Sequence, residues 1–449
     1  MSFPRYPAYK DSGVEWLGMV PEHWDAKPVK NLISRMESGT SVNATDDPAD
    51  PGQFGVLKTS CVYTGQFRPG ENKAVIQAEV GRVSCPLLSN SLIVSRMNTP
   101  DLVGAAGYVS HAPPNIYLPD RLWQVTFQAA APKFIHYWTQ SATYRAGIKT
   151  ACSGTSSSMQ NLGQDQFRSL PIATPPVTEQ RVIAAFLDHE TAKIDALIAE
   201  QQRLIELLNE KRQTVISHAV TKGLNSNVAM KPSGVEWLGD IPEHWSVKRV
   251  STLFQMISSG TTPLSDGPGN YGGNIPWVTT GELRETIITS TEKSVTNFAI
   301  EKFSSLKVYP PGTLLVAMYG ATIGRLGILG VSACTNQACC AFARPTGIVT
   351  DFAYFFFMAA KEFLLLMASG GGQPNINQEK LRALRVSAPP IEEQQDIVSY
   401  LRKHCGEILL LEEEATKGIQ LLQERRSALI SATVTGQIDV RGFASQVAA

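Results

Sequence analysis

The chain has 449 residues, 43% of them hydrophobic, and its 40 lysines and arginines are balanced by 40 aspartates and glutamates. This length predicts about three or four folding units of ordinary globular composition. Zero net charge argues against a uniformly basic protein that binds polyanions over its whole surface. The seven cysteines include no CxxC pair and no histidine partners at zinc spacing, so we expect free thiols, no metal site and a cytoplasmic location.

The N-terminal region contains a segment that occurs twice. SGVEWLGMVPEHW, residues 12–24, returns almost unchanged as SGVEWLGDIPEHW, residues 233–245. Other matches follow each copy in the same order: Ser-Gly-Thr, a Pro-Pro-Val/Ile-x-Glu-Gln motif and a Leu-Leu-x-Glu-Lys/Arg-Arg motif. The repeat is far longer than the roughly 20–50 residues of a solenoid repeat. The sequence therefore predicts a duplication of whole domains.

Each copy of this segment, called the box below, carries two tryptophans. We expect them to act as anchors, because aromatic side chains bury large apolar areas. A catalytic role of the boxes is not expected, because His23 and His244 have no partner at the spacing of a catalytic pair. The four tryptophans are Trp16, Trp24, Trp237 and Trp245.

A variable segment with excess positive charge follows each box. Residues 26–175 contain 13 Lys and Arg against 9 Asp and Glu, and residues 246–388 contain 12 against 8. The boxes and the predicted helices carry the compensating negative charge. The same bias in two separate modules favours contact with a polyanion at both of them.

A long helix is predicted after each Pro-Pro pair. Proline suits the first turn of a helix, and no glycine follows Pro176 until Gly223. A helix over about 178–220 would be roughly 65 Å long at 1.5 Å per residue. Apolar side chains recur every three and four residues in both copies, which is typical of a coiled-coil seam and of partner contacts. The predicted seam is Ile194, Leu197, Gln201, Leu204, Leu208, Lys211, Val215 and His218 in one helix, and Ile408, Leu411, Ala415, Gly418, Leu422, Arg425, Leu429 and Ala432 in the other.

The two helices are expected to pair with each other in antiparallel orientation. A lone helix with one apolar stripe is marginal in water, and a second copy supplies the partner. In that arrangement the N-terminal box lies near the end of the second helix and closes the chain into a ring. The alternative is that each helix packs separately on its own module.

The most apolar window of the chain is Phe352–Ala368. Lys361 and Glu362 interrupt it, and a membrane span needs about 20 uninterrupted apolar residues. We therefore predict one buried helix in the core of the second module.

The doubled order of these motifs resembles the specificity subunit of type I restriction–modification systems. The resemblance rests on the two boxes, the two Pro-Pro motifs and the ending LISATVTGQID, residues 429–439, and it covers essentially the whole chain. It implies two α/β (α+β) target recognition domains separated by two long helices, which form an antiparallel coiled coil with a pseudo-two-fold internal duplication. The expected domains are 1–175 (first recognition domain), 176–224 (first helix), 225–388 (second recognition domain) and 389–449 (second helix and tail).

The same resemblance implies a non-catalytic subunit that reads double-stranded DNA. Each recognition domain would read one half of a bipartite, asymmetric target, and the helices would set the spacer. The implied partners are two methyltransferase (modification) subunits and restriction (translocase) subunits, which would carry S-adenosylmethionine, ATP and magnesium. In agreement, Gly320–Gly327 lacks the Lys-Ser/Thr of a phosphate-binding loop, and no Asn-Pro-Pro-aromatic methyltransferase motif occurs.

Residues that contact DNA are expected in glycine-rich polar loops. Base edges are recognised by Arg, Asn and Gln, and phosphates by Lys, Arg and hydroxyl groups. The strongest candidates are SGTSSSMQN (153–161) and SGGGQPNIN (369–377), because this loop differs between the copies. The alternative is that many of these loops are simple turns and helix caps. The candidates are Thr40, Lys58, Thr59, Ser60, Arg96, Asn98, Ser156, Ser157, Gln160, Asn161, Thr261, Thr279, Thr280, Arg284, Tyr319, Arg325, Gln373, Asn375 and Asn377.

Two other functions explain parts of the sequence. A coiled-coil adaptor that joins two proteins without DNA accounts for the repeat and the neutral charge, but not for the positive excess in both variable segments. A stand-alone methyltransferase would need a cofactor-binding loop, which the sequence lacks. Binding to random duplex DNA in the presence of a methyltransferase partner separates these functions, because phosphate contacts make the affinity strongly salt-dependent.

Overall fold

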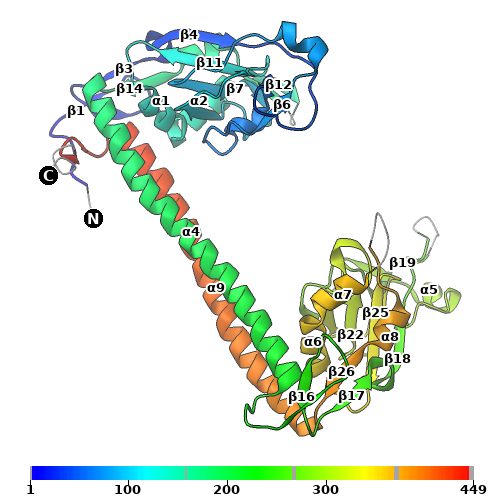
Figure 1. The fold of residues 1–449 in the computed structure, drawn as a ribbon. Coiled ribbons are helices and arrows are strands. Elements are labelled where there is room, and N and C mark those ends of the chain that lie inside the picture. The colour runs from blue at the N-terminus through cyan, green and yellow to red at the C-terminus, as the bar shows by residue number, and fades with distance from the viewer. Residues whose placement is uncertain (1–2, 157–158, 265–268, 369–373, 444–449) are drawn as a thin grey trace. The chain divides into compact units, whose positions relative to one another are not determined.

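The computed structural model describes residues 3–156, 159–264, 269–368 and 374–443. The chain divides into two compact units, one formed by Met1–Gln201 with Lys417–Ala449 and the other by Gln202–Thr416. Each unit therefore combines one variable module with a section of both long helices (Figure 1). We describe each unit separately.

The first unit is a mixed α/β module with short accessory sheets. Its strands are β1 (Tyr9–Asp11), β2 (Met19–Pro21), β3 (Asp25–Pro28), β4 (Ile33–Ser38), β5 (Gly55–Leu57), β6 (Asn72–Ala74), β7 (Ser91–Ser95), β8 (Met97–Asn98), β9 (Ala106–Val109), β10 (Ile116–Tyr117), β11 (Leu122–Phe127), β12 (Ser153–Ser156), β13 (Met159–Asn161) and β14 (Pro171–Thr174). Its shorter helices are η1 (Val29–Asn31), η2 (Thr59–Val62), η3 (Gln77–Arg82), α1 (Pro132–Thr139), α2 (Ala142–Ala151) and α3 (Gln164–Ser169).

The central sheet of the first unit is antiparallel, with the strand order β4-β11-β7-β9. Ser38 pairs with Trp123, and Ser95 pairs with Leu122. The C-terminal ends of β4 and β7 therefore meet the start of β11 at one end of the sheet. One face packs against α1 and α2, and the other packs against the segment around β5 and β10.

The second unit has the same organisation. Its strands are β15 (Met230–Pro232), β16 (Asp240–Pro242), β17 (Ser246–Arg249), β18 (Phe254–Ser259), β19 (Tyr271–Val278), β20 (Thr286–Ile288), β21 (Lys293–Val295), β22 (Leu314–Ala317), β23 (Leu326–Leu329), β24 (Cys334–Thr335), β25 (Cys339–Pro345) and β26 (Arg385–Ala388). Its shorter helices are η4 (Val250–Thr252), α5 (Asn297–Lys302), η5 (Gly320–Thr322), α6 (Thr350–Ala359), α7 (Lys361–Met367) and α8 (Gln378–Ala383). The central sheet has the order β18-β25-β22-β23-β20. Its first four strands repeat the directions found in the first unit, and β20 is an additional parallel strand.

We expected the apolar window of the second module, Phe352–Ala368, to form one buried helix, and this prediction was wrong. The window forms α6 and α7, which meet at Ala360. Phe352 and Phe356 of α6 are completely buried, whereas Leu366 of α7 is 83% exposed. The sequence showed that this window is rich in apolar residues but did not show the bend, which turns side chains of α7 toward solvent.

Two further expectations concern the cysteines and a possible membrane span. All seven cysteines are free, as we expected from their spacing. Within the ranges that the structure describes, no helix combines the length and the apolar character needed to cross a membrane.

The two long helices are α4 (Val177–Lys222) and α9 (Ile391–Val434), each preceded by a Pro-Pro pair. A glycine follows each helix, Gly223 directly after α4 and Gly436 two residues after α9, and both have φ of +76°, a conformation that glycine adopts without steric cost. Each unit contains an antiparallel section of the pair (Figure 1). In the first unit Asp195 of α4 accepts from Arg426 of α9, and in the second Ile216 shares a buried cluster with Leu401.

The buried stripe on these helices differs from the predicted seam at every second position. Ile194 and Ile408 are each 5% exposed, as a seam requires, but Leu197 is 46% and Leu411 is 55% exposed. The prediction was wrong at alternate positions because it took a step of three residues and then four from each buried position, whereas the structure has a step of four and then three. The inward-facing positions are 194, 198, 201, 205, 208, 212, 215 and 219 on α4, and 408, 412, 415, 419, 422, 426, 429 and 433 on α9.

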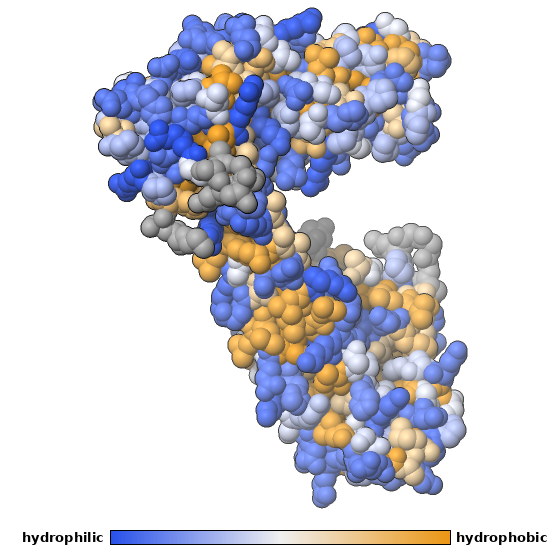
Figure 2. Space-filling view, turned by 60° about the vertical axis from the view of Figure 1, so that its left-hand side comes forward, coloured by the Kyte–Doolittle hydropathy of each residue, from blue (hydrophilic) through white to orange (hydrophobic). Residues whose placement is uncertain are grey.

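The displaced leucines form an exposed apolar strip on the helices. In the second unit Leu204 and Leu207 of α4 and Leu409, Leu410 and Leu411 of α9 are between 42% and 64% exposed. Figure 2 shows apolar side chains gathered on this face of the helices. Leucine is retained at equivalent exposed positions of both copies, since Leu197 corresponds to Leu411 and Leu207 to Leu421.

Candidate nucleic-acid interface

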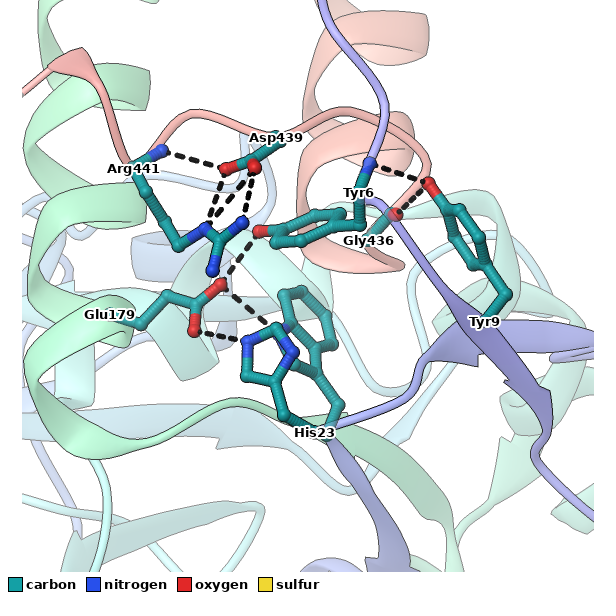
Figure 3. A network of polar contacts seen from close by, with 8 residues as sticks. Tyr6, Tyr9, His23, Glu179, Gly436, Asp439 and Arg441 are labelled. Carbon is teal, nitrogen blue, oxygen red and sulfur yellow. Dashed lines mark hydrogen bonds and ion pairs between the residues drawn. The ribbon is translucent and has the colours of Figure 1, made fainter.

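The first box and the first Pro-Pro motif meet at Glu179 (Figure 3). Glu179 lies in the first turn of α4, and its carboxylate is almost completely buried. It accepts from the Trp24 indole over 3.1 Å and from the Tyr6 hydroxyl over 2.7 Å, and His23 Nε2 lies 2.8 Å from its other oxygen. Burial raises the pKa of Tyr6, and its hydrogen bond to Glu179 raises that pKa further.

The second copy repeats this contact with fewer donors. His244 Nε2 lies 2.8 Å and Trp245 Nε1 lies 3.0 Å from Glu393 Oε2. His23 and His244 therefore do have partners, although the sequence showed none. The partners are the glutamates of the Pro-Pro motifs, more than a hundred residues away, so the distance in sequence concealed the pairing. The contact explains why boxes and Pro-Pro motifs recur together.

The glutamine of each Pro-Pro motif joins the helix to its module. Gln180 Oε1 accepts from the backbone of Ala131, just before α1, over 2.8 Å, and its Nε2 donates to Pro175. Gln394 repeats both contacts, accepting from the backbone of Val349, just before α6, over 2.7 Å. Both glutamines are completely buried. The Glu-Gln pair thus fixes the start of each long helix to a box and to a module at once.

The N-terminal segment also contacts the tail that follows α9, as the expected ring closure requires. The Asp439 backbone donates to Pro4 over 2.8 Å, and the Tyr9 hydroxyl donates to Gly436 over 3.1 Å (Figure 3). The Arg441 guanidinium lies 4.9 Å from the centre of the Tyr6 ring. All of these residues belong to the first unit.

Polar candidates gather at one end of the first central sheet. Thr59 shares a hydrogen bond with Tyr63 over 2.7 Å, and Asn98 donates to the same Tyr63 hydroxyl over 2.9 Å. Asn98 lies in β8, which pairs with Gln160 and Asn161 of β13. The loops after β5 and β7 are therefore joined to the segment before the Pro-Pro motif.

The remaining candidates of the first module lie around the same end of the sheet. Arg96 donates through Nε to the backbone of Asp120, in the turn before β11, over 2.7 Å. Thr40 follows β4 and shares a hydrogen bond with Ser84 over 2.6 Å. Two side chains are tied to local acidic segments: Ser60 to Glu71 over 2.6 Å, and Lys58 to the Asp46 backbone over 3.3 Å.

The glycine of each Ser-Gly-Thr motif has a structural role. A Cβ atom on Gly39 would collide with the backbone carbonyl of Leu118, and one on Gly260 would collide with that of Thr335. Glycine at this position lets the strand end approach the turn that precedes β11 or β25. This requirement explains the repeated motif without reference to DNA.

The second module places its candidates at the equivalent end of its sheet. Tyr319, in the segment after β22, forms a bridge with Asn375 and is 44% exposed. Arg325 is exposed just before β23. Thr279 and its neighbour Thr280 follow β19, and the Thr279 hydroxyl donates to Glu282 over 2.6 Å. The Thr261 carbonyl accepts from the Trp277 indole over 3.1 Å.

Several candidates do not belong to this group. Arg284 stands just before β20, near the start of β23, but its side chain lines a cavity of about 400 Å³ together with Arg212 of α4 and Tyr354. Asn377 caps α8 by accepting from the Lys380 backbone over 2.8 Å, so the helix-cap alternative holds there. The described parts of SGTSSSMQN, Ser153–Ser156 and Met159–Asn161, form β12 and β13 rather than the loop that we expected. Ser157 and Gln373 lie outside the described residues, and the structure assigns Ser156 to β12 only through its backbone.

Three further polar residues lie at these sheet ends and are not among the residues expected from the sequence. Tyr63 connects two candidate loops by its hydroxyl, and Arg121 is an exposed cation in the turn bonded to Arg96. In the second module the exposed Gln337 accepts from Thr262 in the equivalent turn. These turns are not glycine-rich, so the composition of the sequence does not mark them. The pairing of strand ends across the sheet would have been needed to find them.

The first module contacts the helix pair through a polar cavity of about 320 Å³. Arg426 donates to Gln140 Oε1 over 3.1 Å, which leaves the Gln140 amide nitrogen to donate to His136 Nε2 over 2.8 Å. Burial and, to a smaller extent, the charge of Arg426 lower the pKa of His136 to about 4. His136 is therefore neutral near pH 7. Next to it, Lys133 pairs with Asp188 over 2.6 Å.

The equivalent contact in the second unit has the opposite polarity. Asp351, at the start of α6, pairs with Arg402 of α9 over 2.7 Å. These positions correspond to Lys133 and Asp188 in the duplicated order. The two modules thus use the same contact geometry with exchanged charges.

The sequence matches a family model described as the type I restriction modification DNA specificity domain, over residues 21–207 and 242–420. The MjaVIII specificity subunit of Methanocaldococcus jannaschii, a type I restriction enzyme subunit, is 23% identical over 94% of this chain and 95% of its own length. The EcoKI specificity subunit of Escherichia coli is 21% identical over 68% of this chain and 65% of its own length.

Two solved structures resemble the fold. One, from a study of complex assembly and conformational transition of the type I R-M system, has a TM-score of 0.70 at 14% identity and covers 92% of this chain and 98% of its own. The HsdS subunit of Thermoanaerobacter tengcongensis has a TM-score of 0.51 at 16% identity, covering 93% and 98%. The family model covers most of both halves: the last residues of each box, the variable modules and most of each long helix. The chain therefore belongs to the family of type I restriction–modification DNA specificity subunits.

Proposed function

We propose that this chain reads a bipartite, asymmetric DNA target, with one half-site for each module, and that the helices set the spacer. The observation that carries the proposal is that equivalent positions at the two sheet ends hold different residues. Asn98 and Gln160 at the end of one sheet correspond in position to Gly320 and Pro374 near the end of the other. Two related scaffolds with different side chains at the same place suit two different half-sites.

The residues gathered there have the chemistry of base and phosphate recognition. Asn and Gln side chains pair with adenine, and Arg pairs with guanine or phosphate. The first module offers Gln160, Asn161 and Arg121, and the second offers Arg325 and Gln337. Each module has more basic than acidic residues, which supports contact with the DNA backbone.

The spacer function is tested by lengthening the helix pair. Seven residues inserted after Gln201 and seven after Ala415 preserve the spacing of the buried stripe in both helices. We expect the preferred gap to lengthen by about one to three base pairs while both half-sites stay unchanged. Methylome sequencing of a host expressing the variant with its methyltransferase measures both quantities. An unchanged gap in a folded, active variant would exclude the spacer function.

The exposed leucine strip on the helices supports docking of two methyltransferase subunits, with restriction subunits joining that core. Leu197 and Leu207 on α4 correspond to Leu411 and Leu421 on α9, so each half offers a related apolar surface. Exposed apolar patches of this kind mark protein interfaces. The pseudo-two-fold duplication accounts for two copies of one partner on a single chain.

A further inference from the structure

The duplication places Phe186 of α4 and Tyr400 of α9 at equivalent positions. Phe186 is 3% exposed, whereas Tyr400 is 38% exposed. The partner helix beside each ring has an apolar residue at the equivalent position, which is Leu429 in the first unit and Val215 in the second. The difference therefore comes from what covers the aromatic ring in each unit.

Terminal segments cover Phe186 in the first unit. The Phe3 ring lies 5.3 Å and the Phe443 ring 5.2 Å from the Phe186 ring, both edge to face. Two residues before Phe443, Arg441 lies over the Tyr6 ring and close to the buried Glu179 (Figure 3). A segment that turns at Arg441 and Gly442 and carries an arginine and a phenylalanine thus covers the beginning of α4.

In the described part of the second unit, no segment with an arginine and a phenylalanine covers the equivalent position. After Gly223 the chain runs directly into the second box, and Leu224 is 44% exposed. A cavity of about 280 Å³, called the Tyr400 groove, is lined by Tyr400, Leu224, Val215, His218 and the end of α4. It lies where the first unit holds its terminal aromatic side chains.

The carboxylate beside the groove also has an unused oxygen. His244 and Trp245 both contact Glu393 Oε2. Among the residues that the structure describes, no donor reaches Glu393 Oε1, whereas both oxygens of Glu179 have partners. The Glu393 side chain is 29% exposed, against 8% for Glu179.

We propose that the Tyr400 groove binds a short turn of a partner protein that carries an arginine and, two residues later, a phenylalanine. The arginine pairs with the free oxygen of Glu393, and the phenylalanine packs edge to face on Tyr400. The tail of the first unit, Asp439-Val-Arg-Gly-Phe443, is the internal template for the placement of the two side chains; there the Arg441 guanidinium bonds to Asp439 and interacts with Glu179 only through its charge, because both Glu179 oxygens already have partners. DNA is a poor occupant, because the Glu393 carboxylate would face its phosphates.

A peptide with the sequence of residues 436–443, GQIDVRGF, is the probe. It is labelled with fluorescein and titrated into the full chain, and binding is measured by fluorescence anisotropy. We expect saturable binding to the unmodified chain. Tyr400→Glu and, separately, Leu224→Glu should each weaken binding by about tenfold or more, because each removes apolar contact area from the groove. Both side chains are exposed, and circular dichroism checks that the variants fold.

Two controls make the test specific. Leu366→Glu changes an exposed leucine of the same unit outside the groove and should leave binding unchanged. A peptide with alanine in place of its arginine and phenylalanine should not bind. Absence of binding up to about 1 mM peptide, or equal binding to the Tyr400→Glu chain, would overturn the proposal. Neither outcome bears on DNA recognition, which is measured separately by methylation.

Discussion

The Trp24 indole donates to Glu179 over 3.1 Å and so joins the first box to the first turn of α4. Three donors converge on this one buried carboxylate: Trp24, Tyr6 and His23. Glu179→Ala leaves these groups without their acceptor and should lower the free energy of unfolding by roughly 2–4 kcal/mol. Urea unfolding followed by tryptophan fluorescence measures the change.

Two variants of the second Pro-Pro motif can be compared with Glu179→Ala. Glu393→Ala should cost less, about 1–2 kcal/mol, because Glu393 has two donors and is more exposed. Glu392→Ala removes a neighbouring exposed carboxylate and should change stability by less than about 0.5 kcal/mol. Equal effects of Glu179→Ala and Glu392→Ala would show that the contact with the box contributes nothing.

The corrected register of the helix pair predicts opposite outcomes for two neighbouring residues of α4. Ile194 is 5% exposed, so Ile194→Ala should cost about 2–4 kcal/mol through lost burial and a cavity. Leu197 is 46% exposed, and Leu197→Ala should cost less than about 1 kcal/mol. Denaturant midpoints of the two variants decide between the two registers, since the original seam requires similar losses at both positions.

The exposed leucines should matter for assembly rather than for folding. Leu411→Glu should leave the unfolding midpoint almost unchanged, because this side chain is 55% exposed. It should weaken binding of the methyltransferase subunit by about tenfold or more, since a charge would be buried at the interface. Calorimetric titration measures the affinity. Leu366→Glu, on α7, serves as the control and should bind the subunit normally.

The long helices were predictable because their signals are local. The Pro-Pro pairs and the glycines Gly223 and Gly436 mark the ends within a few residues. The exact buried stripe was not predictable, because it includes Arg212 and Arg426, polar residues held by contacts with the modules and the partner helix. Side-chain hydrophobicity does not separate Leu197 from its inward-facing neighbour Ile198, and it favours Leu411 over the inward-facing Glu412.

The candidate site shows the same division between local and distant information. Loop composition located the segments that contain Asn98 and Asn375, and the structure brings each next to the end of a central strand. Composition could not reveal that Asn377 caps a helix or that Arg284 faces the helix pair, since both depend on tertiary contacts. The partners of His23 and His244 were hidden for the same reason.

Stability should depend on pH through His136. The pKa of this side chain is lowered to about 4, chiefly by burial, whereas an unfolded histidine titrates near 6.5. Between these values only the unfolded state takes up the proton, so stability is complete above about pH 6.5 and falls as the pH decreases toward 4. The loss between pH 7 and pH 4.5 should be roughly 2 kcal/mol.

The His136→Gln variant isolates this contribution. Glutamine retains an acceptor for the Gln140 amide but does not titrate, so the variant should lose less stability over the same pH range. Guanidinium unfolding of both proteins at several pH values gives the difference, in which the other titrating groups cancel. If both proteins lost the same stability over this pH range, the pKa of His136 would not be lowered in the folded state.

Recognition of DNA can be tested with two arginines of the second module. Arg325 is exposed at the loop end of the sheet, whereas Arg284 lines the cavity beside Arg212 and Tyr354. If Arg325 contacts a phosphate, Arg325→Ala should weaken binding to all sequences and reduce the salt slope of the affinity by about 1. If it contacts a base, the variant should instead relax one position of a single half-site.

Arg284→Ala should change neither quantity, because its side chain lies on the helix side of the module. Methylome sequencing and salt-dependent binding of the complex with methyltransferase distinguish these results. Loss of recognition in both half-sites at once would contradict the assignment of one half-site to each module.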